Sequence, residues 1–167
     1  MGYYIKSRGS NFKIRKDNID KFFELVENLM NIDTMEKHAS GGSYSNGKKT
    51  SYWYSWVDTE RVKIAIQERD VAALFEEWRY KISGEDDVYL CTYLEPLDGE
   101  QKIGDEELLF VAIASIVESG SFLEMSGEDN SMWEWIWKDG KFFVADAGEV
   151  VYGIPREQTL DSISSPY

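Results

Sequence analysis

Residues 132–137 alternate without interruption and place a tryptophan at every second position. Side chains on a β-strand point alternately to opposite faces, so the three tryptophans share one face of a strand. The Asp139-Gly140 pair that follows predicts a tight hairpin, because glycine accepts the positive φ of a type I′ turn. Residues 121–145 therefore predict an antiparallel meander. Its tryptophan face forms the core if other elements cover it, and a recognition surface if they do not.

Apolar residues recur at helical spacing in much of the remaining chain. This periodicity predicts helices over about 18–31, 71–81 and 106–118, and a shorter helix or turn over 58–66. The expected N-cap residues are Asp17, Asp58, Asp70 and Asp105. Extended segments are predicted over residues 3–14, 51–57, 88–94 and 150–152, and a long polar loop over 38–50.

The order of these elements indicates an α+β protein. We predict a mostly antiparallel sheet with about three helices packed on one face, and a ferredoxin-like arrangement is one candidate. The chain has 167 residues, which fits a single core. We therefore expect one α+β domain over residues 1–155 and a polar C-terminal extension over 156–167.

Negative charge is concentrated in the middle of the chain. The formal net charge is −13, and residues 85–129 hold thirteen acids against the single base Lys102, whereas residues 1–16 hold five bases and no acid. Such a segment repels nucleic acid and attracts basic protein surfaces. One interpretation is that the acids only maintain solubility. The other is an exposed acidic face that binds a basic partner through Glu85, Asp86, Asp87, Asp98, Glu100, Asp105, Glu106, Glu107, Glu128 and Asp129.

Cysteine content and hydropathy point to a reducing, aqueous compartment. Cys91 is the only cysteine, so the chain cannot form an internal disulfide or a cysteine-rich zinc site. The longest apolar stretch, residues 108–117, is about half of what is needed to cross a bilayer. The first residues lack the apolar region of a signal peptide. We expect a cytoplasmic protein that contacts no membrane and holds no metal or cofactor, and its oligomeric state stays open.

The polar stretch 38–50 offers one alternative function. His38 is the only histidine, and no nucleophile motif or metal-ligand spacing surrounds it. Glycine and serine followed by lysines could wrap backbone N–H groups around a phosphate. This small-molecule or nucleotide site would use His38, Ser40, Gly41, Gly42, Ser43, Lys48 and Lys49.

A second alternative is a hydrolase. Glu124 and Glu134 each lie centrally in a predicted strand among aromatic residues. If the two strands pair, the carboxylates can share one face and raise each other's pKa. Paired carboxylates of this kind carry out general acid and base chemistry in glycoside hydrolases. A solvated sheet face also explains both residues, and we expect no catalytic residue elsewhere.

A succession of motifs between Lys102 and Gly140 resembles a known group of proteins. The residues are Lys102-Ile103-Gly104-Asp105-Glu106-Glu107-Leu108-Leu109-Phe110, Gly120-Ser121, Gly127-Glu128-Asp129, Trp133-Glu134-Trp135 and Asp139-Gly140, together with Trp78. In these the chain resembles small acidic accessory proteins of bacteriophages and prophages. That group includes inhibitors of host defence nucleases, anti-CRISPR proteins among them. The resemblance implies a phage or prophage protein that acts in the cytoplasm of a bacterial host. Together with the acidic segment, it leads us to expect a non-enzymatic protein that occupies the basic surface of a nucleic-acid-handling protein, such as a host defence nuclease.

Overall fold

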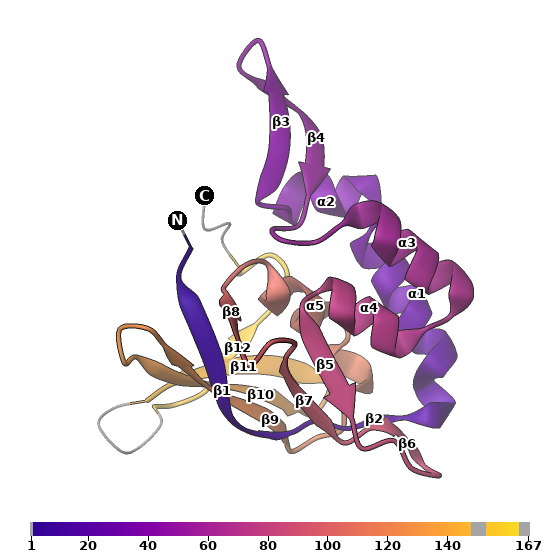
Figure 1. Ribbon diagram of the computed structural model, residues 1–167, viewed down its shortest axis with the longest axis vertical. Coiled ribbons are helices and arrows are strands. Elements are labelled where there is room, and N and C mark those ends of the chain that lie inside the picture. The colour runs from indigo at the N-terminus through magenta and orange to yellow at the C-terminus, as the bar shows by residue number, and fades with distance from the viewer. Residues whose placement is uncertain (1, 148–152, 164–167) are drawn as a thin grey trace.

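Figure 1 shows the computed structural model, which describes residues 2–147 and 153–163. Within these residues the chain forms five α-helices, two short 3-10 helices and twelve strands. The strands form one six-stranded sheet and three two-stranded sheets. The α+β class and the mostly antiparallel sheet are confirmed, but the structure has five helices where about three were predicted. The ferredoxin-like arrangement stays a prediction.

The six-stranded sheet is antiparallel between all neighbouring strands. Its order is β12-β11-β10-β9-β1-β8. The predicted meander forms its centre, and Asp139 and Gly140 close the β10–β11 hairpin with φ values of 53° and 77°. The strands are β1 (Tyr4–Asn11), β8 (Glu100–Lys102), β9 (Ser121–Gly127), β10 (Met132–Lys138), β11 (Lys141–Asp146) and β12 (Arg156–Gln158).

The remaining strands form three small antiparallel pairs. They are β2 (Ile14–Arg15) with β6 (Tyr89–Cys91), β3 (Gly41–Ser45) with β4 (Lys48–Trp53), and β5 (Tyr80–Ser83) with β7 (Tyr93–Pro96). The prediction of a loop over 38–50 was therefore wrong, because a hairpin occupies most of that stretch. The predicted strand over 51–57 ends at Trp53, where a turn replaces it.

The helices are shorter and more numerous than periodicity alone indicated. Asp58 and Asp70 cap α3 and α4 as expected, each accepting backbone N–H groups of the first turn. Asp17 does not act as a cap, because it lies within η1. Asp105 directly precedes α5, but its carboxylate binds Ser40 and not the first turn of the helix. The helices are α1 (Ile19–Leu29), α2 (Ile32–His38), α3 (Thr59–Glu68), α4 (Val71–Glu77) and α5 (Glu106–Ala112), with the 3-10 helices η1 (Lys16–Asn18) and η2 (Ala114–Ile116).

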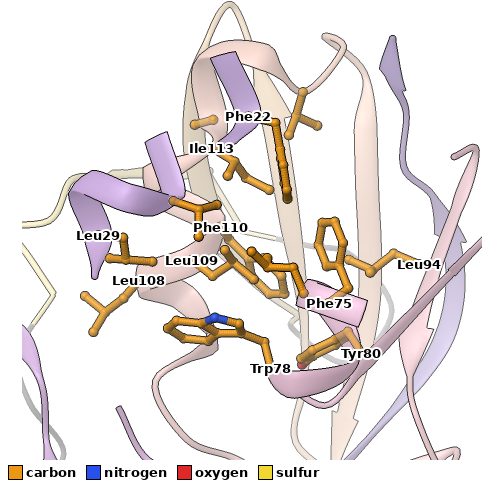
Figure 2. Close-up of a cluster of buried hydrophobic side chains, with 14 of the residues drawn as sticks. Phe22, Leu29, Phe75, Trp78, Tyr80, Leu94, Leu108, Leu109, Phe110 and Ile113 are labelled. Carbon is orange, nitrogen blue, oxygen red and sulfur yellow. The ribbon is translucent and has the colours of Figure 1, made fainter. Parts of the chain in front are cut away.

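The tryptophan face of β10 belongs to the core. Trp135 and Trp137 are fully buried, and Trp133 is half-buried beside them. Phe110 of α5 packs edge-on against both buried indoles, with ring centroids 5.1 Å and 5.3 Å away. Its ring also meets Tyr80 and lies near other buried side chains of the helices (Figure 2). Helix α5 is therefore the element that joins the main sheet to the helical part of the protein.

The opposite face of the sheet carries a different set of side chains. Register places Phe122, Ile136 and Phe143 in one row across β9, β10 and β11. All three are half-buried, and the helices lie on the other side of the sheet (Figure 1). The sheet thus buries one face fully and the other only partly.

Part of the expected polar extension is integrated into the fold. Residues Arg156–Gln158 form β12 beside β11, and Leu160 and Ile163 pack against the core. The predicted strand over 150–152 and the serine-rich end, residues 164–167, lie outside the described residues. None of the helices in the described parts of the chain has the length and apolar character that a membrane span requires.

The position of Phe110 makes it a sensitive test of this core. We expect Phe110→Ala to lower the free energy of unfolding by about 3–5 kcal/mol, because the cavity left among rigid aromatic rings cannot collapse. Urea denaturation followed by tryptophan fluorescence measures the loss. Ile64→Ala, on the exposed face of α3, is the control and should change stability by less than about 0.5 kcal/mol. Equal losses in both variants would contradict the packing described.

Candidate functional site

The β3–β4 hairpin projects from the body of the protein (Figure 1). Its strands have five and six residues, which corresponds to a length of roughly 15–20 Å. Asn46 and Gly47 close its tip, with φ values of 52° and 74° that fit a type I′ turn. The side chains from Ser43 to Lys48 are exposed, and β4 also contacts α2. We call residues 41–53 the arm.

One buried carboxylate fastens both ends of the arm. Asp105 Oδ2 accepts hydrogen bonds from the N–H of Ser40 at 3.1 Å, the hydroxyl of Ser40 at 2.8 Å and the N–H of Ser55 at 2.9 Å. Ser40 directly precedes β3, and Ser55 lies two residues after β4. The hydroxyls of the two serines also bond to each other. Asp105 is only 5% exposed, so these donors compensate a charge withdrawn from water.

A buried tyrosine adds a second attachment behind the arm. The Tyr54 hydroxyl donates to the backbone carbonyl of Leu29 at the end of α1. The Tyr54 ring lies 5.0 Å from that of Trp78, and burial raises the pKa of its hydroxyl. Lys49 Nζ donates to the carbonyl of Ala39 at 3.0 Å. The arm is therefore free at its tip and fixed at its base.

Exposed aromatic side chains lie along the arm and at its base. Tyr44 near the tip is 68% exposed, Trp53 at the end of β4 is 40% exposed, and Trp56 in the following turn is 48% exposed. Trp56 has φ of 65°, a left-handed conformation that is strained for a bulky side chain. Lys102 Nζ lies 5.0 Å from the centre of its ring, and the Arg79 guanidinium lies 5.7 Å away.

The backbone of Gly104 lies close beneath Trp56. A Cβ on Gly104 would come within 3.0 Å of Trp56 Cδ1 and of the Ser55 carbonyl oxygen. The Gly104 N–H in turn donates to Glu106 Oε2 at 2.7 Å. The exposed indole therefore rests on the chain just before α5, and buried carboxylates of α5 hold that chain in place.

The burial of residues 105–107 corrects the prediction of an acidic face. Asp105 and Glu106 are buried, so neither can contact a partner in this fold. Burial raises the pKa of Glu106 to about 7, and its Oε1 receives a bond from the Tyr80 hydroxyl. Glu107 is mostly buried, and its Oε1 accepts the Trp135 indole N–H at 2.9 Å. Three of the ten expected contact residues instead support the core and the base of the arm.

The other expected contact residues fall into two separate groups. Glu85, Asp86 and Asp87 lie in the loop between β5 and β6, where Lys16 Nζ approaches Glu85 to 3.3 Å. The Asp86 carboxylate accepts the N–H groups of Tyr89 and Val88, which lowers its pKa. The loop carries its acids at the end of the protein where β2 pairs with β6.

The second group lies at the opposite end of β1. Asp98 and Glu100 belong to the β7–β8 turn and strand, whereas Glu128 and Asp129 belong to the β9–β10 turn. Hydrogen bonds from Tyr3 and Ser131 lower the pKa of Asp129 to about 2.

Basic residues of β1 and of the segment that follows it lie beside both acidic groups. Lys6 pairs in register with Glu100, and Lys16 lies beside the first group. The acidic segment is therefore divided and interleaved with bases of residues 1–16, and it does not form one continuous face.

Most of the residues of the predicted phosphate site belong to the arm. The donors of Ser40 already hold the Asp105 carboxylate, and Lys49 is bound to a backbone carbonyl. Gly42 lies against the Lys49 side chain, and His38 Nε2 is 3.8 Å from Asp161. Ser40 and Lys49 are thus already bound within the protein, to the Asp105 carboxylate and to a backbone carbonyl. In the described parts of the chain, no group of three His, Cys, Asp or Glu side chains is placed to hold a metal ion.

Glu124 and Glu134 do share a face, as predicted. They are direct cross-strand partners on β9 and β10, and burial followed by the Glu124 charge raises the pKa of Glu134. Their neighbours in the same row are Gly9 on β1 and Ala145 on β11. Neither of these two neighbours carries a polar side chain.

Because Asp105 holds both ends of the arm, removal of its carboxylate should destabilise the protein and loosen the arm. We expect Asp105→Ala to lower the free energy of unfolding by about 3 kcal/mol, since buried donors lose a charged acceptor. Amide hydrogen exchange across the arm should accelerate more than exchange in β9 to β11. Asp98→Ala, an exposed acid in a turn, is the matched control. Unchanged exchange in the arm of Asp105→Ala would show that the carboxylate does not hold it.

Glu106 predicts a dependence of stability on pH. Its folded pKa of about 7 lies above the ordinary value of 4.5, so the folded state binds the proton more tightly. That contribution is complete below about pH 4.5 and is lost as the pH rises through 7, with a total of about 3 kcal/mol. Denaturation at several pH values should show wild type losing stability relative to Glu106→Gln over this range. A constant difference between the two proteins would contradict the assignment.

Comparisons of the chain with protein-family models, with curated proteins and with solved structures gave no match. The function must therefore be inferred from the geometry and charge of the arm and its base.

Proposed function

We propose that the protein is a non-enzymatic binding protein that attaches to a basic surface of a partner protein through its arm. The observation that carries this proposal is the projection of a hairpin that is fixed at its base and exposes Tyr44, Trp53 and the neighbouring Trp56.

The protein holds the arm in place although the arm has little stability of its own, which indicates that the arm has a function. A two-stranded hairpin is marginally stable in water by itself, and this one leaves the side chains around its tip exposed. A buried carboxylate and a buried tyrosine hold its base all the same. Fixing a binding segment before contact lowers the ordering cost of association. Such a pre-organised arm is what a binding protein needs.

The composition of the arm favours recognition of a protein. Its residues are mostly glycine, serine, tyrosine, asparagine and lysine. Tyrosine gives a large contact area at a small entropic cost, and serine, glycine and asparagine adapt their hydrogen bonds, as in antibody binding loops. Aromatic residues are also the commonest energetic anchors of interfaces.

Charge supports a basic partner even without a continuous acidic face. Residues 39–57 contain two lysines and no acid, so all of the negative charge belongs to the rest of the protein. A net charge of −13 raises the association rate with a cationic surface from a distance, and the acids outside the arm supply that attraction. The group of phage proteins that the sequence resembles includes inhibitors of host defence nucleases. The partner to test first is therefore a host defence nuclease, such as a CRISPR effector.

Removing the tip of the arm tests the function. We expect Tyr44→Ala to weaken binding of the partner at least about tenfold, because the arm loses its exposed anchor without losing its base. Immobilised wild type is first used to isolate the partner from host lysate, and biolayer interferometry then measures the affinity of each variant. Ile64→Ala, which alters an exposed side chain of α3, is the control.

Two results of this measurement would contradict the proposal. If the arm variant binds the isolated partner as tightly as the Ile64→Ala control, the arm is not the contact. If the association rate of wild type does not fall as salt is raised, the partner surface is not basic.

A further inference from the structure

A hollow of about 510 Å3 lies where the arm joins the body. It combines two exposed indoles with the start of α3, where two carboxylates lie close together in sequence. Its lining residues are Trp53, Trp56, Val57, Asp58, Thr59 and Glu60.

Trp53 differs from Trp56, the other indole of the hollow, because no cation in the described parts of the chain lies over the Trp53 ring. Lys102 lies over Trp56 and Tyr4, at 5.0 Å and 5.7 Å, and Lys49 lies over Tyr52 at 5.2 Å. Within the described residues, no lysine or arginine of the chain lies over the Trp53 ring. Of the two indoles in the hollow, the Trp53 ring is thus the one that has no cation of the described chain over it.

The position of the Trp53 indole is also fixed. A Cβ on Gly41 would come within 2.3 Å of Trp53 Nε1 and Cδ1, so the pyrrole side of the indole lies directly on the glycine backbone. The side chain is nevertheless 40% exposed. The ring is therefore supported on one side by the arm, and part of its surface is left for another group.

The two carboxylates of the hollow lie at the start of α3, whereas its cations, Lys102 and Arg79, lie over Trp56. Asp58 Oδ1 accepts the N–H groups of Glu60 and Arg61, which holds this carboxylate at the first turn of α3. The Glu60 side chain is mostly exposed, and its nearest cation, Lys63, is 3.5 Å away. Aromatic surface beside carboxylates is the environment that binds a cationic side chain most favourably.

We propose that this hollow receives an arginine side chain of the partner protein, stacked on Trp53 and paired with Asp58 or Glu60. This inference rests on the proposed function and names the chemistry of one contact. Arginine fits better than lysine, because its planar guanidinium stacks on an indole and binds carboxylates through two parallel hydrogen bonds. The acidic net charge of the protein favours the same cation.

A small ligand tests the hollow without the partner. The probe is N-acetyl-arginine amide, and the neutral isostere N-acetyl-citrulline amide is the control ligand. Nuclear magnetic resonance of 15N-labelled protein follows the Trp53 indole N–H and the amides of Val57 and Thr59. We expect saturable shifts at these groups with the arginine derivative, and none with the citrulline derivative.

Variants separate this site from general attraction to an acidic protein. Trp53→Leu should abolish the saturable shifts of Val57 and Thr59, and Glu60→Gln should weaken binding about two- to fivefold. Glu24→Gln removes an exposed acid of α1 and should leave the affinity unchanged. Equal shifts with citrulline, or arginine shifts that persist in Trp53→Leu, would overturn the inference.

Failure here and failure of the proposed function are distinguishable. If the hollow does not bind arginine but the Tyr44→Ala variant loses the partner, the arm still acts and only the arginine contact is wrong. If the hollow binds arginine but the arm variant keeps the partner, the proposed function is wrong.

Discussion

The Asp105 carboxylate is the interaction on which the functional surface depends. One oxygen binds groups from two segments that flank the arm, and the same residue stands immediately before the helix that anchors the main sheet. A buried charge of this kind is tolerated only because its donors are complete. The sheet, the helices and the arm therefore meet at one residue, and the direction in which the hairpin leaves the body is set there.

The parts of the fold that were predictable are those determined by neighbouring residues. The β10–β11 hairpin follows from strict alternation and from the Asp139-Gly140 turn. The starts of α3 and α4 follow from Asp58 and Asp70, whose carboxylates reach the first turn directly behind them. In each case the signal and its physical partner lie within a few positions of each other, so the sequence contains the whole interaction.

The candidate site was not predictable in the same way. Asp105 looks like a helix cap in the sequence, but its partners are 50 and 65 residues away. The acids of residues 85–129 look like one patch, but β1 separates them in space and places bases among them. The arm itself lacks an apolar alternation, because both of its faces meet water over most of its length. The Asn46-Gly47 pair was the one local signal that could have identified it.

Asp105 lies far along the chain from Ser40 and Ser55, the two residues that it binds, and this separation affects how the protein forms during synthesis. A growing chain emerges from the ribosome with its N-terminal part first. Residues 40 to 55 are therefore complete well before the carboxylate at position 105, which follows Ser55 by 50 positions. A nascent chain that has released the hairpin but not the start of α5 lacks the carboxylate that joins the two ends of the arm. A truncated product that ends before α5 would keep the attachments made by Tyr54 and Lys49 but not the one made by Asp105.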